Sequence, residues 1–264
     1  MTAPALLIAA GAARIPVLGL GTWAMRGEEC AKAVADALAL GYRHIDTAAM
    51  YGNEREVGLG LRASGVKRDD VFLTTKVWSS DIGAGDLQRS AEASLSRLQL
   101  PIVDLLLIHW PNPSIALKES IAALCDAKRR GLTRQIGVSN FPVDLLRQAV
   151  AISDEPIAVN QCECNPRFDQ SPLIEECQKH GVVFVSHRPL GKGSLARDPL
   201  LMRIGAAHGK SAAQVALRWH IQKGLVAIPK AARRQHLEEN FAIFDFELAE
   251  KEMEEISAMA RSGR

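Results

Sequence analysis

Residues 105–109 read LLLIH: four consecutive apolar residues followed by a histidine. A short apolar run that ends on a polar residue is typical of a strand covered on both faces in a parallel sheet. The same pattern recurs along the chain at intervals of 30, 33 and 31 residues, where the polar residues that end the runs are Asp46, Lys76, His109 and Asn140. Each interval matches one strand, one crossover helix and the return to a parallel strand. The spacing therefore predicts that these side chains gather at one edge of a sheet.

Helical and strand-like patterns alternate along the rest of the chain. Apolar residues three and four apart indicate the helices, and short β-branched or leucine runs indicate the strands. Eight strands are expected, near residues 18–19, 44–46, 72–75, 104–108, 135–138, 157–160, 182–185 and 225–228. Eight such units predict an α/β fold in which the parallel sheet closes into a (β/α)8 TIM barrel. An open doubly wound sheet is the alternative, which the absence of a GxGxxG motif after the first strand weakens.

Three segments lie outside the simple repeat. Residues 6–18 predict a β-hairpin with glycine in its turn, which would cap the bottom of the barrel. Helical patterns at 199–207 and 212–223 predict extra helices between the last two strands. The glycine-rich segment 189–194 predicts a mobile loop that covers a long ligand. No linker or change of composition divides the chain, so residues 1–264 are expected to form a single domain.

The composition argues against several classes of protein. Hydrophobic residues make up 47% of the 264 residues, which is enough for a large core. The 32 basic and 30 acidic residues are spread along the chain, so we expect a small-molecule substrate, with no nucleic-acid partner and no membrane. The N-terminal stretch lacks the features of a signal peptide, which predicts a cytoplasmic protein. Five cysteines without CxxC spacing predict free thiols and no metal site.

The polar residues after the strands suit proton donation to a carbonyl. Loops that follow barrel strands gather at the end where active sites of this architecture are found. Tyr51 would be an acid at neutral pH only if a nearby cation, Lys76, made its phenolate easier to form. Asp46 would keep Lys76 ionised, and His109 would offer a neutral imidazole to a substrate oxygen. Singly, these residues could be a structural salt bridge, a core histidine and a pocket wall, but together they favour a catalytic group.

Five motifs follow one another along nearly the whole chain: DTAAMYGNE at 46–54, TKVW at 75–78, LIHWP at 107–111, IGVSNF at 136–141 and IPK at 228–230. With these motifs the chain resembles the aldo-keto reductases, most closely the short bacterial branch of 2,5-diketo-gluconate and methylglyoxal reductases. The resemblance implies a (β/α)8 barrel that reduces a small aldehyde or ketone with NADPH. It also implies a catalytic tetrad of Asp46, Tyr51, Lys76 and His109, with Tyr51 as the general acid. Because such relatives are mostly monomers, a monomer is expected.

The resemblance also implies where NADPH binds, extended across the barrel mouth without a Rossmann motif. The expected contacts are Gly21, Thr22, Ser139, Asn140, Gln161, His187, Leu190, Gly191, Lys230, Arg233, Arg234, His236, Glu239 and Asn240. Similar enzymes have a tyrosine or tryptophan at the position of His187, where it stacks on the nicotinamide. Imidazole can also stack, with less area.

At the far end of the cofactor the sequence departs from the family pattern. Similar enzymes hold the 2′-phosphate with a lysine, a hydroxyl residue beside it and an arginine six positions on. Here those places are Lys230, Ala231 and His236. Arg233 and Arg234 could supply the missing donors, or they could be solvated surface. NADPH is therefore expected, and use of NADH is an alternative.

Three of the four tryptophans follow predicted strands. Trp23, Trp78 and Trp110 are expected to form an aromatic-walled cleft for a substrate such as methylglyoxal, an aromatic aldehyde or a keto-sugar. Each indole could instead be buried scaffold. The family usually covers its pocket with a C-terminal tail, but this sequence stops at Arg264, soon after the last predicted helix. An open pocket and a truncated sequence both fit.

Two other functions fit parts of the pattern. A barrel aldolase would use Lys76 as a Schiff-base nucleophile, but Asp46 argues against it because a carboxylate keeps the amine protonated. Trapping with borohydride would separate an aldolase from a reductase. A cofactor-sensing binding module with the same fold is the second alternative. It would bind NADPH tightly and turn over no carbonyl compound.

Overall fold

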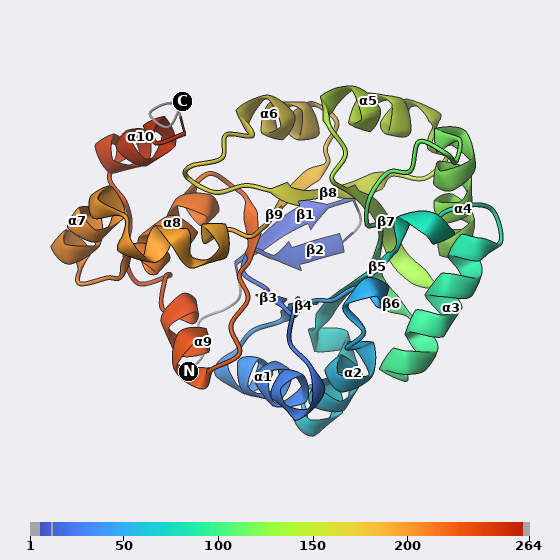
Figure 1. The fold of residues 1–264 in the computed structure, drawn as a ribbon, viewed down its shortest axis with the longest axis horizontal. Helices are drawn as coiled ribbons and strands as arrows, with labels where there is room; N and C mark the ends of the chain where they lie inside the picture. The colour runs from blue at the N-terminus through green and yellow to red at the C-terminus, as the bar shows by residue number, and fades with distance from the viewer. Residues whose placement is uncertain (1–5, 12, 261–264) are drawn as a thin grey trace.

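The computed structural model describes residues 6–11 and 13–260, and its central feature is a sheet of eight parallel strands. In chain order these strands are β3 (Leu20–Gly21), β4 (His44–Asp46), β5 (Phe72–Val77), β6 (Val103–Ile108), β7 (Thr133–Ser139), β8 (Ile157–Glu163), β9 (Val183–His187) and β10 (Val226–Ile228). Each strand pairs with its neighbour in the sequence, so the order in the sheet is the order in the chain. Figure 1 shows them as a ring enclosed by helices.

The first and last strands close the ring. Leu18 and Gly21 form parallel bridges to Ala227 and Lys230, and the amide of Gly19 donates to the carbonyl of Ala227 at 2.9 Å. The two segments approach so closely that a Cβ at Gly21 would lie 2.8 Å from the carbonyl oxygen of Ile228. The predicted barrel is therefore confirmed. The first strand begins two residues later than expected, because Leu18 makes only an isolated bridge.

The helices follow the predicted alternation and cover the outside of the barrel (Figure 1). They are α1 (Gly27–Leu40), α2 (Glu54–Ala63), α3 (Asp86–Leu98), α4 (Leu117–Arg129), α5 (Val143–Ile152), α6 (Ser171–Lys179), α7 (Pro199–His208), α8 (Ala212–Gln222), α9 (Arg234–Phe241) and α10 (Glu250–Ala258). The expected extra helices between the last two strands are α7 and α8. Part of the segment 189–194, where a mobile glycine-rich loop was expected, belongs to the 3-10 segment η4 (Gly191–Arg197), which is interrupted by non-helical backbone at Lys192 and Gly193.

The strand side chains alternate between two apolar layers. Leu105 and Leu107 of β6 belong to the cluster that fills the barrel, together with Val159 of β8. Leu106 and Ile108 of the same strand belong to the larger cluster between the sheet and the helices. This alternation explains the continuous apolar run in the sequence, because both faces of each strand are buried.

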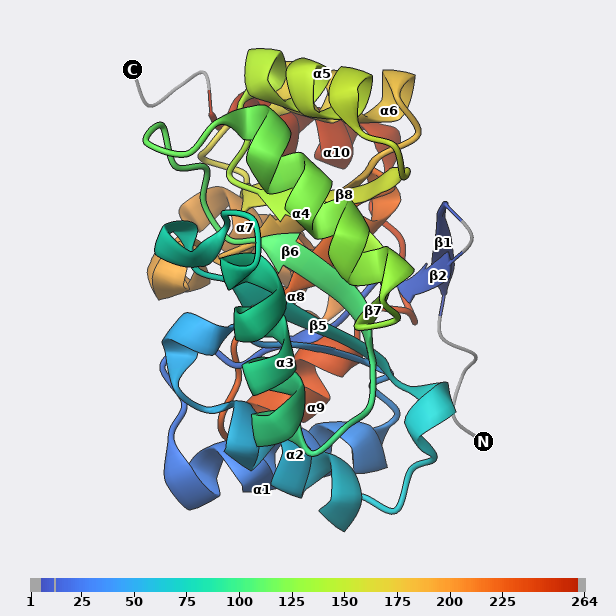
Figure 2. The ribbon, with the colours of Figure 1, turned by 90° about the vertical axis from the view of Figure 1, so that its right-hand side faces the viewer.

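The hairpin of β1 (Leu7–Ala10) and β2 (Ala13–Pro16) closes the end of the barrel where the strands begin. Its Ala10 and Ile15 are fully buried against Phe72 and Val183, the first residues of β5 and β9. Figure 1 shows the hairpin across the centre of the ring, and Figure 2 shows it at one end. The predicted cap is confirmed, although Ala12 in its turn lies outside the described residues.

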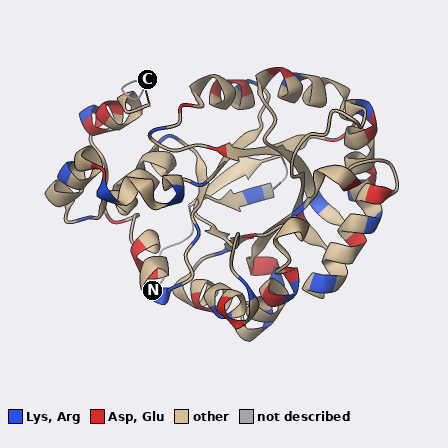
Figure 3. Ribbon diagram, viewed as in Figure 1, with Lys and Arg blue, Asp and Glu red and all other residues tan. Residues whose placement is uncertain are grey.

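Charge is distributed without a dominant sign. Figure 3 shows basic and acidic residues intermixed on the outer helices. Among the described residues, no helix is both long and apolar enough to cross a membrane.

Replacing Ile15 by alanine tests whether the hairpin is part of the core. Ile15→Ala is expected to lower the free energy of unfolding by about 2 to 5 kcal/mol, because it leaves a cavity in a fully buried site. Leu7→Ala in the same hairpin should change it by less than about 0.5 kcal/mol, because Leu7 is 43% exposed. Urea denaturation followed by circular dichroism measures both. A loss below about 0.5 kcal/mol for Ile15→Ala as well would show that the hairpin does not contribute to the core.

Candidate active site

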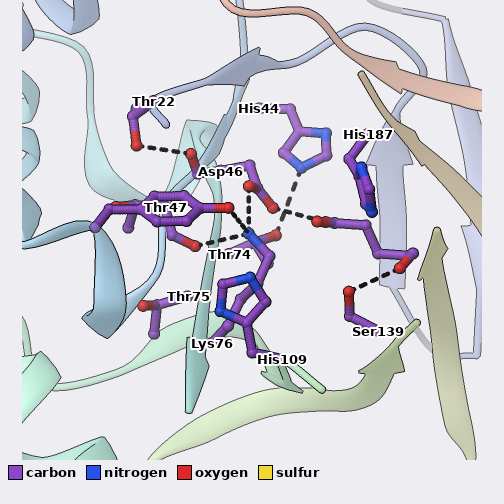
Figure 4. A network of polar contacts seen from close by, with 12 residues as sticks. Thr22, His44, Asp46, Thr47, Thr74, Thr75, Lys76, His109, Ser139 and His187 are labelled. Atoms are coloured by element: carbon purple, nitrogen blue, oxygen red, sulfur yellow. Dashed lines mark hydrogen bonds and ion pairs between the residues drawn. The ribbon is translucent and has the colours of Figure 1, made fainter. Parts of the chain in front are cut away.

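A buried ion pair lies inside the barrel near the ends of β4 and β5. The Nζ atom of Lys76 lies 2.5 Å from Oδ1 of Asp46 and donates to the carbonyl of Thr47 at 3.0 Å. The lysine side chain is 0% exposed, and Figure 4 shows it pointing toward Asp46. The sequence placed Lys76 after its strand, but β5 continues to Val77. The strand can hold a charged side chain in its inward face because Asp46 supplies the opposite charge.

Tyr51 stands beside this ion pair. It ends the short 3-10 helix η1 (Ala49–Tyr51), and Nζ of Lys76 donates to its hydroxyl at 3.3 Å. Burial lowers the pKa of Lys76, but Asp46 and Tyr51 together raise it above its ordinary value. Burial also raises the pKa of Tyr51, and the charge of Lys76 offsets this only in part. Lys76 thus lowers the pKa of Tyr51, as predicted, but not below its usual value. Tyr51 therefore keeps its proton at neutral pH.

His109 follows β6 and packs edge-on against two aromatic rings. Its ring centre lies 5.6 Å from that of Tyr51 and 5.2 Å from that of Trp78. Burial, with the nearby charge of Lys76 and the neighbouring His187, lowers the pKa of His109 to about 3. The imidazole is therefore neutral at neutral pH, in the form that the sequence analysis expected. Its Nδ1 atom is buried and has no hydrogen-bond partner among the described residues.

Residues at the ends of β7, β8 and β9 connect to the same group. Gln161 donates to Oδ2 of Asp46 at 2.8 Å, and the hydroxyl of Ser139 donates to the carbonyl of Gln161 at 2.7 Å. Asn140 donates to the carbonyl of His109 at 2.9 Å, and its Oδ1 atom lies 3.1 Å from Nε2 of His187. The structure therefore brings these four residues, predicted to contact the cofactor, next to the predicted acid group.

Two buried polar residues after Tyr51 were not recognised as functional in the sequence. Asn53 is fully buried, accepts from the hydroxyl of Thr47 at 2.8 Å and donates to two carbonyl groups of the loop after β3. Glu54 is 1% exposed and accepts from Thr75 at 2.5 Å and from Arg97 at 2.7 Å. Asn53 thus ties the Tyr51 loop to the loop after β3, and Glu54 ties it to β5. The sequence shows these two residues as the end of the DTAAMYGNE motif, but the sequence alone does not show that they are buried.

The cluster of Asp46, Tyr51, Lys76 and His109 opens into a pocket of about 760 Å³. Tyr51 and His109 line it, as do Trp23 and Trp110, whose side chains are 46% and 47% exposed. Trp78 is not among its lining residues and instead packs on His109. The wall also contains apolar and charged residues that the sequence motifs did not indicate: Met50, Glu163, Phe168, Leu173, Arg188 and Lys192.

The remaining predicted cofactor residues have different surroundings. Gly21, Leu190 and Lys230 line the pocket. Thr22 is fully buried, and its hydroxyl donates to the carbonyl of Asp46 at 3.0 Å. Gly191 begins η4 with a φ of +54°.

The predicted phosphate contacts lie at the start of α9. The Nη2 atom of Arg233 lies 3.1 Å from the Nε2 atom of His236. Arg234 instead pairs with Glu238 at 2.9 Å and with Asp36 of α1 at 3.4 Å. Further along α9, Gln235 donates to Glu239, and Asn240 is buried. Arg234 therefore has acidic partners, whereas Arg233 contacts a histidine.

A model of the aldo/keto reductase family matches residues 17–261. This chain belongs to the aldo-keto reductase family. The relationship extends over almost all of it: the methylglyoxal reductase DkgB of Escherichia coli O157:H7 is 38% identical over 248 residues, which are 93% of each chain. Together with the family, such reductase relatives identify this aldo-keto reductase as an NAD(P)H-dependent oxidoreductase.

Solved structures support the same assignment. The crystal structure of a putative 2,5-diketo-D-gluconic acid reductase B is 43% identical, has a TM-score of 0.95, and covers 97% of this chain and 92% of its own. A Bombyx mori aldo-keto reductase in complex with NADP is 33% identical, with a TM-score of 0.91 and coverage of 98% and 94%. The predicted bacterial branch and a nicotinamide cofactor are thereby supported. The roles of individual residues in this chain remain predictions.

The charged pair can be tested by stability alone. Asp46→Asn or Lys76→Met leaves one buried charge without its partner and is expected to cost about 3 to 5 kcal/mol. The double variant removes both charges, so it should be more stable than either single variant. Urea denaturation of the four proteins gives the coupling energy. Single effects that add in the double variant would mean that the pair does not act as a unit.

Proposed function

We propose that this enzyme reduces the carbonyl group of a small aldehyde or ketone with NADPH, and that Tyr51 donates the proton. The observation that carries the proposal is the position of Lys76, whose ammonium lies 2.5 Å from Asp46 and 3.3 Å from the Tyr51 hydroxyl. A cation held at this place stabilises the phenolate that forms when the proton leaves. Asp46 keeps the cation in position.

The other residues of the group would stabilise charge on the substrate oxygen. Because His109 is neutral, it can donate one hydrogen bond without competing as a proton donor. Tyr51 and His109 face the same pocket, so both can act on one carbonyl oxygen. Bound NADPH would supply the hydride that reaches the carbonyl carbon. A Schiff-base reaction at Lys76 is disfavoured, because the raised pKa of Lys76 keeps its amine protonated at neutral pH.

The residues present fit a long anionic cofactor. The pocket extends from Tyr51 and His109 to Lys192 and Lys230, so a cation-bearing wall is continuous with the proton donor. Asn140 and Gln161 line it with amide groups that suit a carboxamide. Of the two arginines, Arg233 is the better candidate to bind the 2′-phosphate of NADPH, because Arg234 already has two acidic partners. We therefore favour NADPH over NADH.

The substrate is expected to be small and partly apolar. Trp23, Met50, Trp110 and Phe168 line the mouth, and each is about half exposed. Such a rim suits methylglyoxal, aromatic aldehydes and keto-sugars, and the names of similar enzymes include methylglyoxal reductase and 2,5-diketo-D-gluconic acid reductase.

All five cysteines are buried and free, which supports a reducing cytoplasmic environment.

Tyr51→Phe tests the function and the proton donor together. The wild type is expected to oxidise NADPH in the presence of methylglyoxal or an aromatic aldehyde, measured at the nicotinamide absorbance band. The variant should lose about 100-fold to 10,000-fold in kcat, the usual contribution of a general acid, with unchanged affinity for NADPH. Tyr42→Phe, the same change at the other tyrosine, should keep its kcat because Tyr42 is not among the residues that line the pocket and its hydroxyl donates to the carbonyl of Leu237 in α9. A Tyr51→Phe enzyme with normal kcat would exclude the proposed acid.

A pair of matched variants tests the phosphate contact. Arg233→Gln is expected to raise the KM for NADPH about tenfold, as loss of a charge-assisted hydrogen bond would, and to leave the KM for NADH unchanged. Arg234→Gln should change either value less than about twofold, because its guanidinium is already paired with Glu238 and Asp36. Steady-state kinetics with both nucleotides gives the answer. The reverse result would place the phosphate at Arg234.

A further inference from the structure

Arg188 is a pocket residue to which the reduction mechanism assigns no role. It directly follows β9 and lines the pocket that Tyr51 and His109 also line. Its Nη1 atom donates to Oε2 of Glu163, at the end of β8, at 2.7 Å. Its Cζ atom lies 5.7 Å from the ring centre of Trp23, in the loop after β3. The guanidinium therefore forms part of the pocket wall between two strand ends and an exposed indole.

The backbone at this position is also unusual. Arg188 has a φ of +51°, in the left-handed region that residues with a Cβ seldom adopt. Such conformations concentrate where a structure must direct a group to a ligand. The side chain remains 38% exposed even though it contacts both Glu163 and Trp23. It is held in place and still accessible to a small molecule.

The charges around the pocket favour an anion. Among the residues that line it, the acidic ones are Asp46 and Glu163, and the basic ones are Arg188, Lys192 and Lys230. Lys76 already neutralises Asp46, and Lys192 and Lys230 are the cations assigned above to the anionic cofactor. Arg188, paired with Glu163, is the pocket cation that remains for a substrate. Burial dominates and raises the pKa of Tyr51, but the charge of Arg188 acts on the same phenol in the opposite direction. Arg188 and Tyr51 line the same pocket, so one substrate can contact both.

Arg188 has donors to spare. A guanidinium carries five N–H groups in a planar fork that matches a carboxylate. Of these, only Nη1 is hydrogen-bonded to another described residue, Glu163. The cation–π contact of its Cζ atom with the Trp23 ring, at 5.7 Å, uses none of the N–H donors.

We propose that Arg188 determines substrate specificity by binding a carboxylate on the substrate, so that aldehyde acids and keto acids are preferred over neutral carbonyl compounds of the same shape. The inference rests on the carbonyl reduction proposed above. It adds a second anchoring point, because Tyr51 and His109 hold the carbonyl oxygen and Arg188 holds the acid group.

The test compares two substrates that differ in charge but hardly in shape: 4-carboxybenzaldehyde and 4-formylbenzamide. The readout is the ratio of their kcat/KM values with NADPH. Arg188→Gln is expected to lower this ratio about 10-fold to 100-fold, mainly through the KM of the acid, with little change for the amide. Arg188→Lys keeps the charge without the fork and should lower it by a smaller factor.

Lys192→Gln is the matched control, because it removes the same charge from the same pocket. It should change the ratio less than about twofold. An unchanged ratio in Arg188→Gln would overturn the inference, as would equal losses in the Arg188 and Lys192 variants, which would indicate a general field. A raised KM for NADPH with an unchanged ratio would assign Arg188 to the cofactor instead. If the wild type reduces 4-formylbenzamide at least as well as 4-carboxybenzaldehyde, the inference about Arg188 fails while the proposed carbonyl reduction stands.

Discussion

The buried ion pair of Lys76 and Asp46 is the interaction on which the rest of the site depends. An ammonium without exposure to water is costly, and it persists only when a carboxylate and further acceptors surround it. Here Asp46 and the carbonyl of Thr47 take two donors of Lys76, and the third points to Tyr51. The arrangement leaves the phenol as the one partner of the cation that can change its protonation during a reaction. The same ion pair therefore stabilises the buried site and places a positive charge beside the proposed proton donor.

The barrel makes this pair possible because it brings together strands that are distant in the sequence. Asp46 comes from β4, Lys76 from β5 and Gln161 from β8, and all three side chains are directed into the barrel at the ends of their strands. Gln161 satisfies the second oxygen of Asp46, which would otherwise be an unpaired acceptor in a buried site. The apolar layers below, closed by the hairpin, keep water away from the pair from the other end.

Periodicity in the sequence was enough to predict the barrel, because the strands of the eight-stranded sheet are buried on both faces and their apolar runs are continuous. The glycine turn predicted the hairpin, and apolar residues three and four apart predicted the extra helices. It could not predict that Lys76 lies within β5, since its partner is 30 residues away. It could not predict the pKa of Tyr51 either, because burial outweighs the charge of Lys76 and depends on the whole fold. The buried roles of Asn53 and Glu54, and the packing of Trp78 on His109, are similarly set by tertiary contacts.

Burial also fixes the charge state of the site around neutral pH. His109 and His187 have pKa values lowered to about 3, chiefly by burial, so both stay neutral well below pH 7. The pKa values of Tyr51 and Lys76 are raised above their ordinary values, so both keep their protons well above pH 7. None of these four groups titrates near neutrality. We propose Tyr51 as the proton donor because it is the neutral acid beside a permanent cation, whereas two protonated imidazoles in the same pocket would repel Lys76.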